Sequence, residues 1–371
     1  MNGVSSAAVA VDPPRAAPDV AAMAGARPGD FLVADIGSSQ VRMGLVSRVA
    51  GPAGAPAVIA TRVFESATHP HLEDIVRGFC DALAVRPREL VLACAGYVQA
   101  GVVVSRHLAW PVVPGELSRS LGLAQVHFLN TLEALAYEMP GIDLKPSMCL
   151  KAGAGREATA GTTLILGVGH GLGAAALLPG RSRRVLATEI GQIQLAARVG
   201  LEQQVLANVA PSGAHIPSER LLSVPGLHRL YLALCAIRNR FPRHEDAGAV
   251  AAAALDGDEL ASEVLTLYCG WLGAFAGDLA AVYGTTGGIY LVGGLFARIR
   301  DFMSDGPFVE RFLDKGVMRP FLQRVPIHVL ERGWHGVVGA ARWRLDVHRP
   351  GADTSTDSIA TGDAYPPTGT R

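Results

Sequence analysis

The chain has 371 residues and a mass of 38.7 kDa, and its 33 basic and 33 acidic side chains cancel to a formal net charge of zero. A balanced charge gives no field that would attract nucleic acid or an anionic membrane, so we expect neither as a partner. With 49% hydrophobic and 18% charged residues the chain should fold as a globular protein, and its length suggests about two domains.

The two ends of the chain have a different composition from the middle. Residues 1–29 are rich in Ala, Val, Gly and Pro and lack the basic segment and long apolar run of a signal peptide, so they predict a disordered leader. Residues 347–371 are rich in Thr, Asp, Pro and Gly and predict a disordered tail. We place a small N-terminal α/β lobe at 30–140 and a larger C-terminal α/β lobe at 141–346.

The first half of the folded region alternates strands and helices. Residues 31–46 predict two apolar strands joined by a Gly/Ser turn. The elements expected after this hairpin are a helix at 71–83, strands at 90–95, 102–105 and 126–129, and a helix at 131–138.

The second half repeats this arrangement. A strand at 162–167, a glycine turn at 167–173 and a strand at 174–178 form another strand-turn-strand unit. Long helices are expected at 218–237 and 255–282, and late strands at 289–292 and 327–330. Two such units in one α/β chain suggest duplicated lobes around a cleft. We find no purely apolar run of 18 residues, and therefore expect no membrane span.

Five widely spaced cysteines form no Cys-x-x-Cys motif. An odd number without ligand spacing favours buried free thiols in a reducing cytoplasm over zinc binding or a disulfide framework.

Two polar glycine turns are the best candidates for chemistry. Successive backbone amides in Asp35–Ser39 and Gly167–Gly173 could form anion-binding nests. Ser39 would add a hydroxyl donor, and Asp35 could hold Mg²⁺ through water. Each turn could equally be an ordinary hairpin turn. No Gly-Lys-Ser/Thr follows, which excludes a Walker loop, and the flanking strands disfavour a Rossmann fingerprint.

Three glycine turns together resemble those of the actin-like ATPase superfold, and the chain resembles the bacterial glucokinase family over about 31–345. Residues 34–42 resemble the first phosphate motif, with Ser38 in place of a glycine and Gln40 in place of an asparagine. Residues 167–173 keep all four glycines of the second motif, and residues 288–294 resemble the adenosine-side strand and turn. The resemblance implies two actin-like (ribonuclease H-like) lobes and ATP with Mg²⁺ as cofactors. It implies phosphate or nucleotide contacts at Asp35, Gly37, Ser38, Ser39, Gly169, His170, Gly171, Gly173, Gly293 and Gly294. His170 replaces the threonine of the family motif.

The sugar site departs from the family pattern. The family has an Asn-Asp pair whose aspartate is the general base, and here the pair is Asn130-Thr131. Threonine cannot accept a proton at neutral pH. Glu133 could be a substitute base, but Asn130-x-x-Glu133 is also the pattern of a helix capping box, which we favour. By resemblance, Glu189, Gln192 and Glu219 complete the sugar site, with Gln192 in place of a histidine.

Two functions follow from this combination. The first is ATP-dependent phosphorylation of glucose or a related hexose at the 6-hydroxyl, slowed by the loss of the aspartate. The second is a catalytically inactive protein that binds sugar or nucleotide and has a regulatory role. The expected partners are a small-molecule sugar and ATP, with a cytoplasmic location and a homodimer as the family-based oligomeric state.

Overall fold

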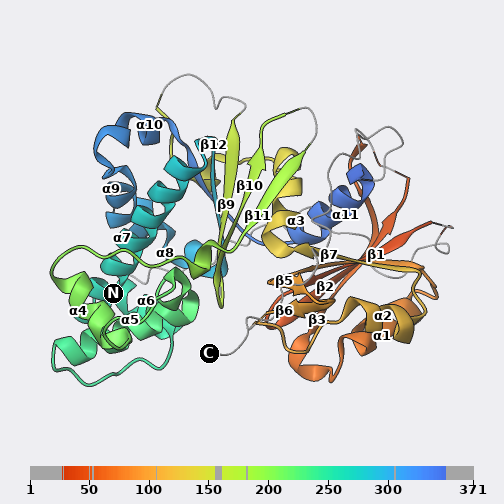
Figure 1. The fold of residues 1–371 in the computed structure, drawn as a ribbon, viewed down its shortest axis with the longest axis horizontal. Coiled ribbons are helices and arrows are strands. Elements are labelled where there is room, and N and C mark those ends of the chain that lie inside the picture. The colour runs from red at the N-terminus through yellow and green to blue at the C-terminus, as the bar shows by residue number, and fades with distance from the viewer. Residues whose placement is uncertain are drawn as a thin grey trace, which may run out of the picture.

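The computed structural model describes residues 27, 29–49, 51, 54–105, 107–154, 161–180, 183–304 and 306–347. The predicted leader and tail lie almost entirely outside these residues. Two lobes, each built on a mixed sheet, stand side by side (Figure 1). The predicted α/β architecture is confirmed.

The first lobe has a five-stranded sheet in the order β3-β2-β1-β4-β7. Its central strand β1 is buried along its whole length because both faces are covered. Alternate residues of β1 point to opposite faces: Leu32 packs toward α1 and α2, whereas Phe31 and Val33 pack toward α11. The elements are β1 (Phe31–Ile36), β2 (Gln40–Ser47), β3 (Ala57–Glu65), α1 (Leu72–Ala82), β4 (Glu89–Cys94), β5 (Tyr97–Gln99), β6 (Val102–Val104), α2 (Pro114–Leu121), β7 (Gln125–Asn130) and α3 (Thr131–Glu138).

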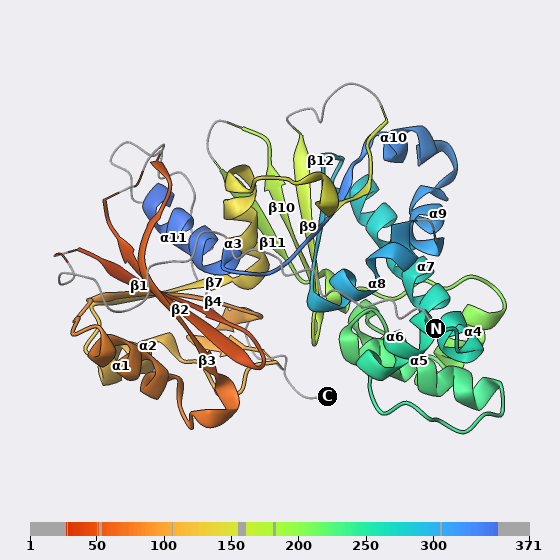
Figure 2. The ribbon, with the colours of Figure 1, turned by 180° about the vertical axis from the view of Figure 1, so that it is seen from behind.

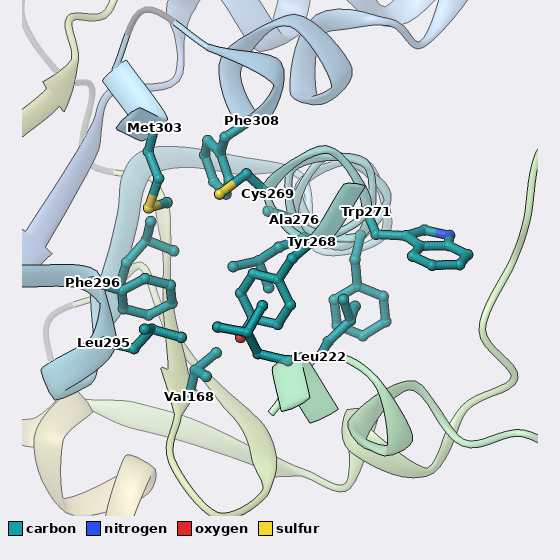
Figure 3. Close-up of a cluster of buried hydrophobic side chains, with 14 of the residues drawn as sticks. Val168, Leu222, Tyr268, Cys269, Trp271, Ala276, Leu295, Phe296, Met303 and Phe308 are labelled. Carbon is teal, nitrogen blue, oxygen red and sulfur yellow. The ribbon is translucent and has the colours of Figure 1, made fainter. Parts of the chain in front are cut away.

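The second lobe has a six-stranded sheet in the order β11-β10-β9-β12-β13-β8 and most of the helices. Its core lies between the sheet and the helical layer, where Val168 at the end of β9 meets side chains such as Tyr268 and Phe296 (Figure 3). The elements are β8 (Cys149–Lys151), β9 (Thr162–Val168), β10 (Leu172–Leu178), β11 (Arg184–Thr188), α4 (Leu201–Val209), α5 (Val224–Ile237), α6 (Ala247–Leu255), α7 (Glu259–Val282), β12 (Thr285–Val292), α8 (Gly294–Ser304), α9 (Pro307–Leu313), α10 (Arg319–Arg324) and β13 (Ile327–Leu330). Helix α11 (His335–Val347) follows β13 in the chain but packs on the first sheet.

Helix α7 is the one helix among the described residues that is long and apolar enough to cross a membrane. However, 72% of its most apolar window is buried inside the second lobe. Tyr268, Trp271 and Leu272 on this helix are almost completely buried in the core. The burial identifies α7 as the core helix of its lobe.

Helices α3 and α11 pack against each other between the two sheets, although α11 comes last among the described elements (Figures 1 and 2). Helix α11 lies on the first sheet, where Val337, Ala340 and Ala341 join the cluster around Phe31. The chain therefore returns to the N-terminal sheet after completing the second one. The boundary at 140 and 141 stays a prediction, but the helix at 335–347 packs with the first lobe.

Several elements differ from the sequence-based expectations. Strand β3 and helix α2 were not predicted, and neither were α4 and α8–α11. The long helix expected at 218–237 begins only at Val224, because Ser223 caps it by accepting a hydrogen bond from Gly226 N. The helix expected at 255–282 is α7, which begins only at Glu259, because Asp258 caps it by accepting a hydrogen bond from Ala261 N. The preceding helix α6, which ends at Leu255, was not predicted.

The α3–α11 contact depends on a glycine. A Cβ placed on Gly339 would lie 1.8 Å from the carbonyl oxygen of Ala134, so the two backbones touch at this point. We predict that Gly339→Ala lowers the free energy of unfolding by about 1–3 kcal/mol or more, because the helices must separate. Chemical denaturation checks this. The control is Gly78→Ala in α1, where the added methyl meets open space and should stabilise by about 0.5–1 kcal/mol. Equal effects at both positions would contradict the prediction.

Glu89, the first residue of β4 in the first lobe, is the centre of a cluster of charged side chains. Glu89 accepts hydrogen bonds from Arg48 at 2.7 Å, from His127 Nε2 at 2.9 Å and from Arg344. Burial of Glu89 opposes its ionisation, but the bonds from His127 and Arg344 outweigh this and lower its pKa to about 2.

The lowered pKa of Glu89 makes stability depend on pH. A carboxyl with a folded-state pKa below its ordinary value stabilises the fold above about pH 4.5 and loses this contribution as the pH falls toward 2. We predict that Glu89→Gln loses on the order of 3 kcal/mol at pH 7, and that its unfolding free energy changes less than that of the wild type between pH 5 and pH 3. Urea unfolding at these pH values measures both. Parallel pH profiles for the two proteins would refute the assignment.

Candidate functional site

A cleft of about 630 Å³ separates the two lobes and is lined by residues from both. It contains all the sequence-predicted site residues except Asp35 and Ser39. Those that line it are Gly37, Ser38, Asn130, Thr131, Gly169, His170, Gly171, Gly173, Glu189, Gln192, Glu219, Gly293 and Gly294. Residues up to 257 positions apart in the sequence, from Gly37 to Gly294, are thus brought to one surface.

The two predicted phosphate turns meet across the cleft. Ser38, between β1 and β2, has its Oγ 2.8 Å from Nδ1 of His170, between β9 and β10. Both turns are tight hairpin turns, closed by hydrogen bonds from Gly37 N to Gln40 O and from Gly169 N to Gly171 O. Ser39 is exposed and does not line the cleft, so in this conformation its hydroxyl does not take the predicted position.

The glycines of the cleft differ in how closely other atoms approach them: Gly293 meets backbone, Gly171 meets the ends of two side chains, and Gly169 has open space. A Cβ on Gly171 would lie 2.7 Å from His107 Nε2 and 3.0 Å from Glu219 Oε2. A Cβ on Gly293 would lie 2.1 Å from the carbonyl oxygen of Val168. Gly294, the first residue of α8, also lines the cleft.

Asp35 is completely buried and forms an ion pair. Its Oδ1 accepts a hydrogen bond from Nη2 of Arg332 at 2.5 Å, and its Oδ2 has no partner among the described residues. The carboxylate packs against Gly336 in the first turn of α11, where a Cβ would lie 2.5 Å from Oδ2.

The predicted Mg²⁺ site at Asp35 was tested against this geometry. No group of three or more His, Cys, Asp or Glu side chains that could hold a metal occurs in the described part of the chain. Asp35 is 0% exposed, and one of its oxygens is already bound to a guanidinium. As arranged here, the residues do not fit a Mg²⁺ ion held by the protein, because Arg332 provides the positive charge at this carboxylate.

Asn130 and Thr131 sit where β7 ends and α3 begins. Oδ1 of Asn130 accepts from Leu132 N at 2.9 Å, and its Nδ2 donates to Gly96 O at 3.1 Å. Thr131 is 9% exposed, and its Oγ1 has no partner among the described residues.

Glu133 completes the capping box that the sequence predicted. Its carboxylate accepts a hydrogen bond from the backbone of Asn130, and Asn130 caps α3. Burial raises the pKa of Glu133 to about 7, an effect that the hydrogen bond from Asn130 partly offsets. Glu133 does not line the cleft.

Glu219 is the centre of a polar group to which both lobes contribute. His107 Nε2 lies 3.9 Å from its Oε2, and Gln192 and the amide of Leu172 donate to its carboxylate. The neighbouring His107 side chain lowers the pKa of Glu219, burial opposes this, and donation from Gln192 lowers it further, so the net shift is downward. Burial and then the neighbouring charge of Glu219 raise the pKa of Glu189.

Sequence reasoning missed Arg332, which lines the cleft beside the first glycine turn. It follows β13 in a segment with no motif, and 297 residues separate it from Asp35. Tyr97 and Thr188 also line the cleft and were not predicted. No local pattern could have identified these residues.

Comparison with known proteins agrees with this geometry. A family model described as glucokinase matches residues 32–346. The glucokinase-like protein of Xylella fastidiosa is 39% identical over 319 residues, which cover 85% of this chain and 95% of the relative. The glucokinase of Saccharophagus degradans is 32% identical over 316 residues, which cover 84% and 97%.

Among solved structures, the glucokinase of an Antarctic psychrotroph superimposes with a TM-score of 0.70 at 30% identity, covering 85% of this chain and 99% of that one. The prediction of two actin-like lobes around a cleft is confirmed. Because the family model spans nearly the whole folded region and these relatives match along almost their full length, the chain belongs to the glucokinase family.

Proposed function

We propose that this protein transfers the terminal phosphoryl group of ATP to the 6-hydroxyl of glucose or a related hexose, at a reduced rate. The observation that carries the proposal is the single cleft in which both glycine turns face Glu189, Gln192 and Glu219. Backbone amides of the turns suit a polyphosphate, and carboxylate and carboxamide groups suit sugar hydroxyls. A Mg²⁺ ion would have to enter with the nucleotide, since Asp35 is bound to Arg332.

The reduced rate follows from Thr131. In the family pattern its position holds the aspartate that accepts the hydroxyl proton, and a threonine hydroxyl has no such capacity at neutral pH. A positioned general base contributes roughly 10²–10⁴-fold. Phosphoryl transfer depends mainly on positioning and charge stabilisation, so some activity is expected to remain.

The second candidate function is sugar or nucleotide binding without catalysis. Two observations favour it: Thr131 at the base position, and the hydrogen bond between Ser38 and His170 that joins the two glycine turns. A ligand phosphate entering between these turns would have to replace that bond. Closure of the lobes on a ligand would then serve as a signal. A homodimer and a cytoplasmic location stay predictions.

Restoring the family residue separates the two functions. We predict that Thr131→Asp raises the turnover of glucose phosphorylation about tenfold or more, because a carboxylate there can accept the proton. A coupled assay for glucose 6-phosphate measures turnover. The control is Thr131→Asn, which has a similar shape and no basic oxygen. If neither variant nor the wild type forms product while calorimetry detects glucose or ATP binding, the kinase proposal fails and the binding function is supported.

The role of Glu133 can be tested at the same time. Glutamine also completes a capping box, so Glu133→Gln should keep the stability of α3 while removing any basic carboxylate. We predict unchanged turnover and a melting temperature close to that of the wild type. A hundredfold loss of turnover without unfolding would instead identify Glu133 as the base.

Sugar affinity provides an independent test of the second lobe. We predict that Glu219→Gln weakens glucose binding about tenfold, because the substitution removes a charged acceptor that also orders Gln192. Titration calorimetry measures glucose affinity whether the protein is a kinase or a binding protein. The control is Glu263→Gln, which alters a surface ion pair with Arg238. Equal affinities for the two variants would exclude Glu219 from the sugar site.

A further inference from the structure

Arg332 is a cationic side chain in the cleft that the proposed reaction has not used. It lies between β13 and α11, in the segment that crosses from the second sheet to the first. Its side chain is 31% exposed, and it lines the cleft together with Gly37, Gly293 and Gly294. These are the glycines of the first and third turns, which the sequence assigns to the nucleotide.

Asp35 fixes the orientation of this guanidinium. Nη2 of Arg332 donates to Oδ1 of Asp35, and the carboxylate is 0% exposed. Arginine presents its donors in a rigid planar fork, so anchoring one amino group fixes the direction of the other. Asp35 therefore positions Arg332, and the complete burial of Asp35 limits the movement of the pair.

The second amino group is directed toward the first glycine turn. Nη1 lies 3.2 Å from the point where a Cβ of Gly37 would be, and it makes no hydrogen bond with a described residue. An available guanidinium donor beside a glycine turn fits a phosphate group, because charge-assisted bonds to phosphate are strong and geometrically matched. Arg42 and Glu65 also act on this charge cluster, which contains two arginines and two carboxylates.

We propose that Arg332 is a phosphate-binding residue that Asp35 holds in place, and that it contributes the positive charge which the sequence assigned to Mg²⁺ at this position. The ligand is a phosphate group in the cleft, either of a nucleotide or of a sugar phosphate. The inference rests on the proposed function for the identity of these ligands. The inference requires that Arg332 contacts the phosphate group directly, so that this contact forms without a divalent cation.

The primary variant is Arg332→Lys, chosen to preserve folding. A lysine keeps a positive charge for buried Asp35, but one ammonium cannot both hold Asp35 and replace the outward amino group. Arg332→Gln alone would leave Asp35 charged and unpaired, which destabilises. The second variant is therefore Asp35→Asn combined with Arg332→Gln, which removes both charges. The matched control is Arg86→Gln, which alters an exposed pair with Asp81.

The measurement is titration calorimetry of the full chain with ATP, glucose 6-phosphate and glucose, in Mg²⁺ and in EDTA. We expect Arg332→Lys to weaken binding of at least one phosphate ligand about tenfold or more in EDTA, with glucose affinity unchanged. Loss for ATP alone assigns the residue to the nucleotide, and loss for glucose 6-phosphate alone assigns it to the sugar ester. Arg86→Gln should bind all three like the wild type.

Two results would overturn the inference: wild-type affinity for both phosphate ligands in both Arg332 variants, or no binding of either ligand by the wild type in EDTA. These outcomes are distinct from failure of the proposed function. If the protein forms no product but substitution of Arg332 weakens ATP binding, the phosphate site is supported and the kinase proposal fails. If the protein phosphorylates glucose but both Arg332 variants bind ATP and glucose 6-phosphate with unchanged affinity, the kinase proposal stands and phosphate binding by Arg332 is excluded.

Discussion

The close contact between α3 and α11 is the constraint on which the cleft depends. Gly339 has no side chain that would collide with the carbonyl oxygen of Ala134, so the backbones of the two helices can contact each other between the sheets. The first turn of α3 presents Asn130 and Thr131 to the cleft, and the segment that leads into α11 presents Arg332. One helix contact thus sets the relative positions of site residues from the middle and the end of the chain. Leu132 extends this control to the second lobe, since it occupies the space that side chains on Gly167 and Gly173 would fill.

A protein without net charge must hold an anionic ligand with local groups. The cleft contains different groups for the phosphate and for the sugar that we propose as its ligands. The groups proposed to bind phosphate are the glycine amides and Arg332, whose guanidinium is oriented by the buried carboxylate of Asp35. The groups proposed to bind sugar are Glu189 and Glu219, which would repel phosphate and can accept hydrogen bonds from hydroxyls. The separation of charge along one cleft therefore favours a single orientation of a sugar and a polyphosphate, although the overall field of the protein attracts neither.

Features that depend on neighbouring residues were predictable from the sequence. The glycine turns, the hairpins around them and the Asn130–Glu133 capping box are of this kind, because hydrogen bonds within a few residues define them. The helix expected at 255–282 begins four residues later in the structure, at Glu259, because the side chain of Asp258 caps its first turn. Arg332 could not be predicted from the sequence, for a different reason. Its partner Asp35 is 297 residues away, and the pairing exists only because α11 returns to the first sheet. Long-range topology creates that contact, and no periodicity or motif encodes it.

The site residues differ in how far folding alone accounts for them. Asn130 caps α3 and binds Gly96 O, so its presence is explained without a ligand. The presence of Glu219 is partly explained, since it accepts hydrogen bonds from Gln192 and the backbone of Leu172 and so links residues that line the cleft. Glu189 has no such role: its carboxylate makes no hydrogen bond or ion pair with a described residue, faces the cleft, and has its pKa raised by burial and by Glu219. A carboxylate kept beside another carboxylate without a structural partner costs stability. That cost makes Glu189 stronger support for a ligand with hydroxyl donors than the better-matched Asn130.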